Sequence, residues 1–352
     1  MGKLNHTVIR LGLESLYFSG AYHVLRPLAG GIGAILMLHH VRPEKAEPFQ
    51  PNRLLEVTPE YLERIVTYLR GSGLDLVSMD EAYRRIANGS TGRRFVAITL
   101  DDGYRDVQQY AHPIFKAHQV PFTMYVATNF AERVGELWWL ALEAVILRSS
   151  RISLVMDGEE RSFDCATTAA KYETFTQVYW WLRSLPTEDD LRNAVRDLAA
   201  RYQVDVVEFC KTLCMGWDEL AVMAQDPLVT IGAHTVNHVI LSKVGETDVI
   251  SELADSQAGI EAKLGVNPQH FAYPVGDTTS AGPREFKIAA DLGFKTAVTT
   301  RPGVIFPEHR EHLLALPRIS VNGEFQKLRY FEVLMSGAAT GLANRFRHVN
   351  VA

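Results

Sequence analysis

Polar side chains gather directly after two apolar runs of this sequence. Asp101 and Asp102 follow the first run, and His234 and His238, four residues apart, follow the second. If both runs are parallel strands of one barrel, their carboxyl ends meet at the edge where such barrels build active sites. One aspartate and two histidines then supply three ligands for a divalent metal and leave a position for water, as catalytic sites do. A helix cap explains one aspartate, and two histidines at this spacing also occur by chance, so the prediction depends on both groups together.

These motifs resemble those of a known enzyme family. The run LDDGY resembles TFDDG, and HTVNH resembles H[S/T]xxH, of the polysaccharide deacetylases, which are carbohydrate esterase family 4 and carry the NodB-homology domain. The resemblance covers about Ile35–Ile319 and implies a distorted (β/α) barrel. It implies that Asp102, His234 and His238 bind a divalent metal, with Zn²⁺ expected, and that Asp101 deprotonates the attacking water. Two adjacent unpaired carboxylates repel each other, so giving one of them to a cation removes the conflict.

A third segment departs from the family pattern. FAYPVGD stands where many relatives have RxxPYG, which puts Ala272 at the arginine position and Val275 at the tyrosine position. The backbone N–H of Val275 could still donate to an oxyanion, whereas Pro274 has no N–H to donate. We hypothesise that Arg318, at the end of the last predicted strand, supplies the missing positive charge. The alternative is a surface arginine after a proline turn.

The sequence departs from the family pattern a second time, because no LxH motif occurs near the C-terminus. In many relatives the histidine of that motif is the general acid that protonates the leaving amine. His39 and His40 end the first predicted strand, and His309 and His312 precede the last. We favour His39, since LMLHHV resembles the LMYHxV of one branch of the family. Side chains alternate along a strand, so only one of the first two histidines should face the site. A hydrogen-bonded structural histidine is the alternative.

Other side chains near the motifs are predicted to contact substrate. Tyr104, Tyr273 and Asp277 flank the metal and third motifs. The pairs Trp138–Trp139 and Trp180–Trp181 could stack on sugar rings, but buried helix packing is the favoured interpretation.

The fold class follows from alternation of short apolar runs with helix-length segments. Such alternation predicts parallel strands with helical crossovers, closed or nearly closed into an α/β barrel. Helix starts are expected at Thr58–Pro59 and at Thr187, which has Asp190 in capping-box spacing. The predicted strands are Ala34–Leu38, Phe95–Leu100, Phe122–Ala127, Leu228–Gly232, His270–Tyr273, Lys295–Thr299 and Leu314–Ile319.

The length of 352 residues exceeds what the barrel needs. Asp102 and His234 must meet although 132 positions separate them, so we expect a mainly helical insertion over 132–215, with a small hairpin near Met156–Glu159. The expected domains are an N-terminal helical segment over 1–33, the interrupted barrel over 34–323, and a C-terminal helix over 324–352. We expect the insertion to select the substrate.

Composition argues against a disordered chain, a collagen and a membrane-spanning bundle. Apolar residues make up 47% and charged residues 22%, as in chains with a large core. The formal net charge of −5 predicts no nucleic-acid partner. Cys165, Cys210 and Cys214 lack CxxC spacing, so buried thiols are expected rather than disulfides or a thiolate metal site.

The two ends of the chain carry no export signal or membrane span, so a cytoplasmic location is expected. The N-terminal helix has an apolar stripe that includes Val8, Leu13 and Phe18, which packing on its own domain explains best. The same stripe and the basic end of Phe325–Val349 would also suit a peripheral place at the inner membrane face. The oligomeric state stays open.

The leading functional hypothesis is a metal-dependent hydrolase that removes N-acetyl, or O-acetyl, groups from a carbohydrate. Its substrate would be an N-acetylglucosamine-containing polysaccharide, oligosaccharide or glycolipid precursor. One alternative is an amidohydrolase of small cyclic ureides or formamides. Another is a catalytically weak glycan-binding relative, which the retained Asp101 and Asp102 argue against, because binding alone requires no base beside the metal.

Overall fold

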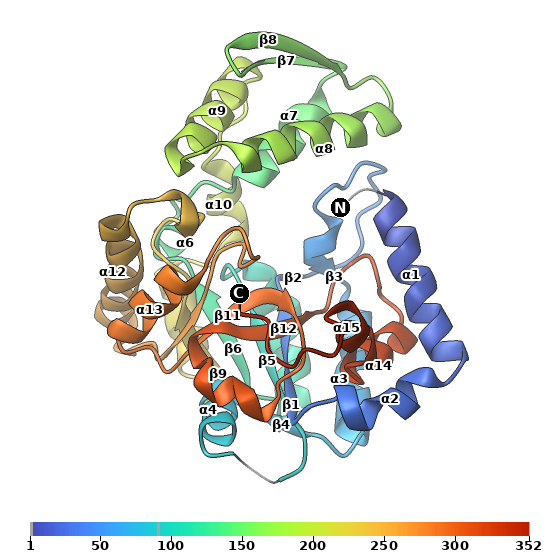
Figure 1. Ribbon diagram of the computed structural model, residues 1–352. Coiled ribbons are helices and arrows are strands. Elements are labelled where there is room, and N and C mark those ends of the chain that lie inside the picture. Colours follow the sequence, from blue (N-terminus) through green and yellow to red (C-terminus); the bar gives the residue numbers. More distant parts are fainter. Residues whose placement is uncertain (1–2, 90–91, 352) are drawn as a thin grey trace.

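The computed structural model describes residues 3–89 and 92–351, and its centre is a closed parallel barrel (Figure 1). The strands follow one another around the barrel in the order β1, β12, β11, β10, β9, β6 and β5, and β5 pairs back with β1. This arrangement confirms the α/β barrel. The strands are β1 (Gly33–Leu38), β5 (Phe95–Leu100), β6 (Phe122–Val126), β9 (Val229–Ala233), β10 (His270–Ala272), β11 (Thr296–Pro302) and β12 (Leu316–Ser320).

The barrel is distorted where β5 changes partner. The first half of β5 pairs with the short strand β4 (Asp75–Val77), and its second half pairs with β6. The register between β11 and β12 also shifts, between Val298 and Pro302. Each predicted strand is present, with ends displaced by at most three residues. The short strands β4, β2 (His40–Val41) and β3 (Glu56–Val57) were not predicted, because two or three residues make no apolar run.

Local features of the sequence explain why these strands and helices form. Every residue of β1, β5 and β6 is buried, as expected for strands covered on both faces. Helix α3 (Pro59–Gly71) begins at the predicted cap, where the Thr58 hydroxyl accepts the N–H of Tyr61. The other helices around the barrel are α4 (Met79–Ala87), α5 (His112–Ala117), α12 (Glu246–Leu264) and α13 (Pro283–Asp291).

A mainly helical segment leaves the barrel after β6 and returns at β9. Helices α7 to α9 and a hairpin lie together beyond one end of the barrel (Figure 1). The hairpin turns at Asp157–Gly158, and α9 begins at the predicted Thr187 cap. The elements are α6 (Thr128–Ala131), α7 (Trp138–Arg148), β7 (Arg151–Met156), β8 (Glu159–Asp164), α8 (Thr168–Ser184), α9 (Glu188–Arg201), α10 (Glu208–Leu213) and α11 (Trp217–Ala224).

The two ends of the chain pack together beside the barrel. Helices α1 (Lys3–Phe18) and α2 (Ala21–Ala29) contact α14 (Leu328–Met335) and α15 (Ala338–Ala343). Two helices thus stand where one C-terminal helix was expected, because Gly337 adopts a φ of 75° and breaks the helix. Across the part of the chain that the structure describes, no helix combines the length and apolar character needed to cross a bilayer. The three cysteines are buried free thiols, as predicted.

Candidate metal centre and active site

Asp102, His234 and His238 meet at the carboxyl end of the barrel. Asp102 follows β5, and both histidines follow β9, which β6 separates from β5. The Nε2 atoms of the two histidines each lie 3.3 Å from Oδ1 of Asp102. One potential ligand atom from each residue lies within 4.8 Å of the other two, and all three side chains are buried. The sequence prediction that these three residues converge is therefore correct.

The hydrogen bonds of these side chains fit a cation. The Nδ1 atom of His234 lies 2.6 Å from the carbonyl oxygen of Ala272 and donates to it, which leaves Nε2 as the electron-pair atom facing Asp102. Oδ1 of Asp102 accepts no aligned hydrogen bond from the described residues, although it is buried. Buried acceptor atoms that converge without donors are costly, and a divalent metal satisfies all of them.

The charges of this group are strongly coupled. Burial disfavours the Asp102 carboxylate, yet the neighbouring His234 and His238 imidazoles, each 3.3 Å away, hold the pKa of Asp102 well below its usual range. Burial likewise disfavours a charged imidazole, yet the two aspartates raise the pKa of His234. The ligand set therefore combines one firmly ionised carboxylate with two imidazoles.

Three residues of the two metal-binding loops have left-handed backbone. The φ angles are 71° at Asp102, 65° at Thr235 and 55° at His238. Such conformations cost about 1–3 kcal/mol each and persist only where the surroundings enforce them. The Thr235 hydroxyl, which accepts the N–H of His238, is one part of that enforcement.

Arg318 pairs with Asp101 directly beside the three ligands. Its Nη1 and Nη2 atoms donate to the two carboxylate oxygens at 2.8 and 2.7 Å. It also donates to the carbonyl of Thr299 and the hydroxyl of Thr99, so this fully buried guanidinium is no surface residue. Burial favours the neutral acid, yet the Arg318 charge lowers the pKa of Asp101. The structure thus places Arg318 where the hypothesis requires a positive charge.

The two histidines after β1 face different surroundings. Nε2 of His39 lies 3.8 Å from Oδ2 of Asp101, and the His39 side chain is partly exposed. His40 is buried, stacks on Tyr104, and lies with Nδ1 2.6 Å from the Asp106 carboxylate. Of the two residues, His39 is the one placed beside Asp101.

His309 and His312 lie away from the metal centre. After β11 the chain turns back, and Ile305 bonds to Gly33, the first residue of β1, at the amino-terminal end of the barrel. Four residues later, His309 is fully buried, and its Nδ1 accepts the N–H of Phe306. Their position in the sequence, just before the last strand, did not reveal this reversal of the chain.

Burial lowers the pKa of His309 to about 4. Between about pH 6.5 and 4 the unfolded chain binds a proton here that the native state does not, so stability falls as the pH falls. We expect this histidine to contribute a loss of about 3 kcal/mol across that interval. Chemical unfolding of His309→Gln from pH 7 to 4 should show a flatter acid limb than the parent. Parallel curves for the two proteins would contradict the assignment.

The predicted oxyanion donor keeps a free N–H. Val275 lies three residues after Ala272 and adopts a φ of 62°, a strained conformation for a β-branched residue. Among the described residues its N–H donates no hydrogen bond, while its carbonyl accepts one from Thr300. This geometry leaves the N–H available to a ligand.

Two of the three predicted substrate residues, Tyr104 and Tyr273, are buried, whereas Asp277 is partly exposed. The Tyr273 ring is buried, and its hydroxyl donates to the carbonyl of Leu314. Tyr104 is buried against His40, so neither ring offers a surface to a sugar. Asp277 pairs with Arg183 of α8 at 2.9 Å. These residues pack the barrel or join it to the helical segment, which their position beside the motifs could not show.

Two residues of the helical segment, which the sequence did not predict to have a functional role, support the loop that carries His238. Arg192 of α9 donates to the carbonyl oxygens of Asn237, at 2.8 Å, and His238, at 3.4 Å. Glu188, one turn earlier, accepts both from Arg192 and from the N–H of Ile240. Four-residue spacing of Glu and Arg is ordinary on helices, so nothing in the sequence marked this pair.

The same segment also holds the aspartate loop. The N–H of Met215 donates to the carbonyl of Gly103, and Cys214 forms a bridge with Tyr104. In addition, the Trp139 ring from α7 lies 5.1 Å from the His238 ring. The helical segment therefore contacts both loops that carry metal ligands.

We expect Arg192→Met to weaken metal affinity by about 10- to 100-fold, as the loss of groups that support metal ligands usually does. The change frees the Asn237 and His238 carbonyls and leaves Glu188 buried without its partner. Arg196→Met is the matched control, since Arg196 lies one turn further along α9 and is half exposed. Competition with a chelator measures the affinities. Equal affinities of the two variants would contradict this role.

Comparison with known proteins agrees with this geometry. A family model described as polysaccharide deacetylase matches residues 88–158 and 166–297. The Streptococcus pyogenes deacetylase PplD, solved in complex with acetate, aligns with a TM-score of 0.57 and 20% identity over 86% of this chain and 97% of that one. IcaB from Ammonifex degensii aligns with a TM-score of 0.54 and 18% identity over 88% and 97%.

A third structure, a de-N-acetylase from Aggregatibacter actinomycetemcomitans, aligns with a TM-score of 0.55 and 13% identity over 86% of this chain and 99% of that one. At these identities the structures establish a shared fold. Comparison with curated proteins gave no significant match. The family model spans more than half of the chain and includes both metal motifs. The chain belongs to the polysaccharide deacetylase family.

Proposed function

We propose that this deacetylase-family hydrolase removes N-acetyl groups from a carbohydrate that contains N-acetylglucosamine. The observation that carries the proposal is the second carboxylate. Asp101 lies next to the three metal ligands, yet its oxygens bind Arg318, so it stays outside the ligand set. A site that only binds glycan requires no such base.

Asp102, His234 and His238 would hold the metal, and we propose Zn²⁺. Zinc accepts one oxygen and two nitrogen ligands with an open position for water. When bound, a divalent ion of this kind polarises a carbonyl and makes water more acidic.

The residues around the metal ligands would divide the remaining tasks. Asp101, ionised and oriented by two hydrogen bonds from Arg318, accepts the proton of the attacking water. The free N–H of Val275 donates to the oxyanion that develops on the acetyl oxygen. His39, beside Asp101, protonates the leaving amine.

The direct test measures metal content and acetate release from N-acetylglucosamine oligomers by the same preparation. We expect one divalent ion per chain and acetate in proportion to enzyme. Bound metal without acetate would instead favour the glycan-binding alternative, and release of product only from cyclic ureides or formamides would favour the amidohydrolase alternative.

His39→Ala should lower kcat by about 10²–10⁴, because a positioned general acid contributes by that order. KM should change little, since the change removes a proton donor rather than a binding surface. Steady-state kinetics on the best oligomer separates the two constants. His40→Ala is the neighbouring control, because His40 bonds to Asp106 outside the site and its loss should reduce stability instead. An unchanged kcat in His39→Ala would remove this residue from the mechanism.

A further inference from the structure

The N-terminal helices α1 and α2 expose a concentration of apolar side chains. Val8, Leu11 and Phe18 of α1 and Val24 and Leu28 of α2 are each between 59% and 77% exposed. They are five of the fourteen large hydrophobic side chains exposed among the described residues, although the two helices contain only 25 residues. Such concentrations on a surface mark sites of interaction.

Helix α1 has two apolar sides. Ile9, Leu13 and Leu16 pack against the protein. Val8, Leu11 and Phe18 recur at helical spacing on another side, which the described residues leave uncovered. A helix that only packs on its own domain requires one apolar stripe, so the second stripe is available to a partner.

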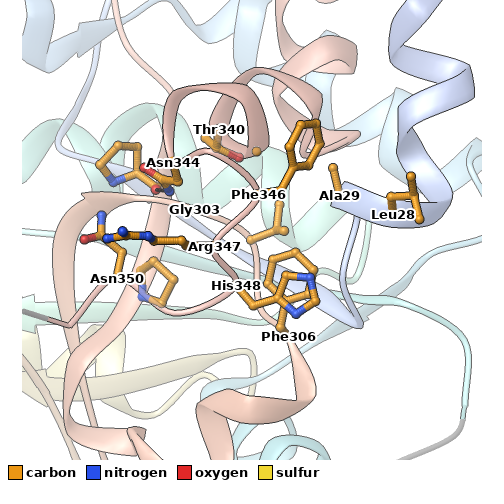
Figure 2. Close-up of a pocket in the computed structure, with 14 residues that line it drawn as sticks. Leu28, Ala29, Gly303, Phe306, Thr340, Asn344, Phe346, Arg347, His348 and Asn350 are labelled. Carbon is orange, nitrogen blue, oxygen red and sulfur yellow. Dashed lines mark hydrogen bonds between the residues drawn. The ribbon is translucent and has the colours of Figure 1, made fainter.

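The C-terminal segment extends this surface beside α2. Leu28 of α2 lines the same pocket as Phe346 and Arg347 (Figure 2). Leu342, on α15, and Phe346 are also exposed. The exposed apolar residues of the two ends of the chain therefore belong to adjacent elements.

Positive charge accompanies these apolar side chains. Residues 1–30 and 324–352 each carry a net charge of +2, whereas the whole chain carries −5. Arg10, Arg26, Arg345 and Arg347 are exposed and form no ion pair with any residue that the structure describes. Apolar side chains bordered by unpaired arginines complement a surface that is apolar inside and anionic outside.

We propose that α1, α2 and residues 342–347, at and after the end of α15, dock the protein on a membrane containing anionic lipids. We name this surface the terminal face, consisting of Val8, Leu11, Phe18, Val24, Leu28, Leu342 and Phe346 with the four arginines. A second copy of the chain fits less well, because a two-fold interface would bring the same unpaired arginines of both copies together. The proposal does not depend on the hydrolase reaction.

Flotation of the full chain with lipid vesicles tests the proposal. We expect binding to vesicles of phosphatidylcholine with 30% phosphatidylglycerol, and little binding to phosphatidylcholine alone. Binding to the mixed vesicles should weaken as salt is raised, because salt screens the arginine contribution. Equal binding to the two kinds of vesicle, or none to either, would overturn the proposal.

Two sets of substitutions separate the apolar and charged contributions. Val8→Ser, Leu11→Ser and Val24→Ser together should lower the partition coefficient at least tenfold. Their matched control combines three changes at apolar residues exposed elsewhere, Val134→Ser, Val222→Ser and Ile250→Ser, and should bind as the parent does.

The charge variant combines Arg10→Gln, Arg26→Gln and Arg347→Gln, which keeps the apolar stripe. It should lose most of the preference for anionic vesicles and most of the salt dependence. Circular dichroism and thermal unfolding confirm that each variant is folded. Membrane binding unaffected by both sets would refute the terminal face, and so would a dimer in solution that the serine changes dissociate.

Discussion

Asp101→Asn is expected to abolish most turnover while the metal stays bound. Asparagine has nearly the same shape but cannot accept a proton, so kcat should fall by about 10²–10⁴ or more. Asp101 is outside the group of residues that converge on the metal position. Metal content by elemental analysis should therefore match the parent, and acetate release gives the rate.

The adjacent carboxylate provides the control for this result. Asp102→Asn should lose metal and activity together, because it removes the charged ligand from a buried set of three. If Asp101→Asn instead lost the metal, Asp101 would be a ligand and not the base. Full turnover by Asp101→Asn would discard the proposed mechanism.

Arg318→Met is expected to reduce stability by about 3–5 kcal/mol, because it leaves a buried carboxylate without its partner. In the parent, the Arg318 charge outweighs burial and lowers the pKa of Asp101, so the pair stabilises the fold above the ordinary aspartate pKa, and this contribution is lost on acidification. Without Arg318, burial alone raises that pKa. The deficit of the variant should therefore grow as the pH rises from about 4 to 7, as urea unfolding at several pH values would measure.

A double substitution shows whether Arg318 acts through Asp101. Arg318→Met with Asp101→Asn buries no unpaired charge, so it should recover much of the stability that Arg318→Met alone loses. The single variant should also shift the acid limb of the kcat/KM profile to higher pH, because its base has a raised pKa. If the Arg318→Met enzyme kept the stability and the pH profile of the parent, Arg318 would have no effect on Asp101.

The sequence predicted the barrel well because its strands are buried on both faces. A run such as FVAITL can be identified as a buried strand without knowing which strands it pairs with. The polar residues that follow such strands can only lie at the carboxyl edge of the barrel. Asp102, His234 and His238 converge for that reason. The convergence of Arg318 and Asp101 was a harder inference, since it depended on a charge missing from another segment.

Contacts between elements that are distant in the chain could not be predicted from the sequence. Tyr104 and Tyr273 lie beside motif residues, but neighbouring residues on a strand or loop point in different directions, and both rings turn into the core. Arg192 supports His238 across 46 positions through backbone carbonyls, which every residue type presents alike. Predictions from residue type and spacing cannot detect a contact of this kind.

The attachment of the helical segment to both metal loops also has a consequence for how the protein can change. Segments added to a barrel are often regarded as modules that can be exchanged while the chemistry below remains intact. Here Arg192 supports the loop of His238, and Met215 bonds to the residue after Asp102. A transplanted segment would have to restore these contacts before the two loops could keep their conformations. Changes in the helical segment of this protein are therefore coupled to the geometry of the residues that converge at the metal centre.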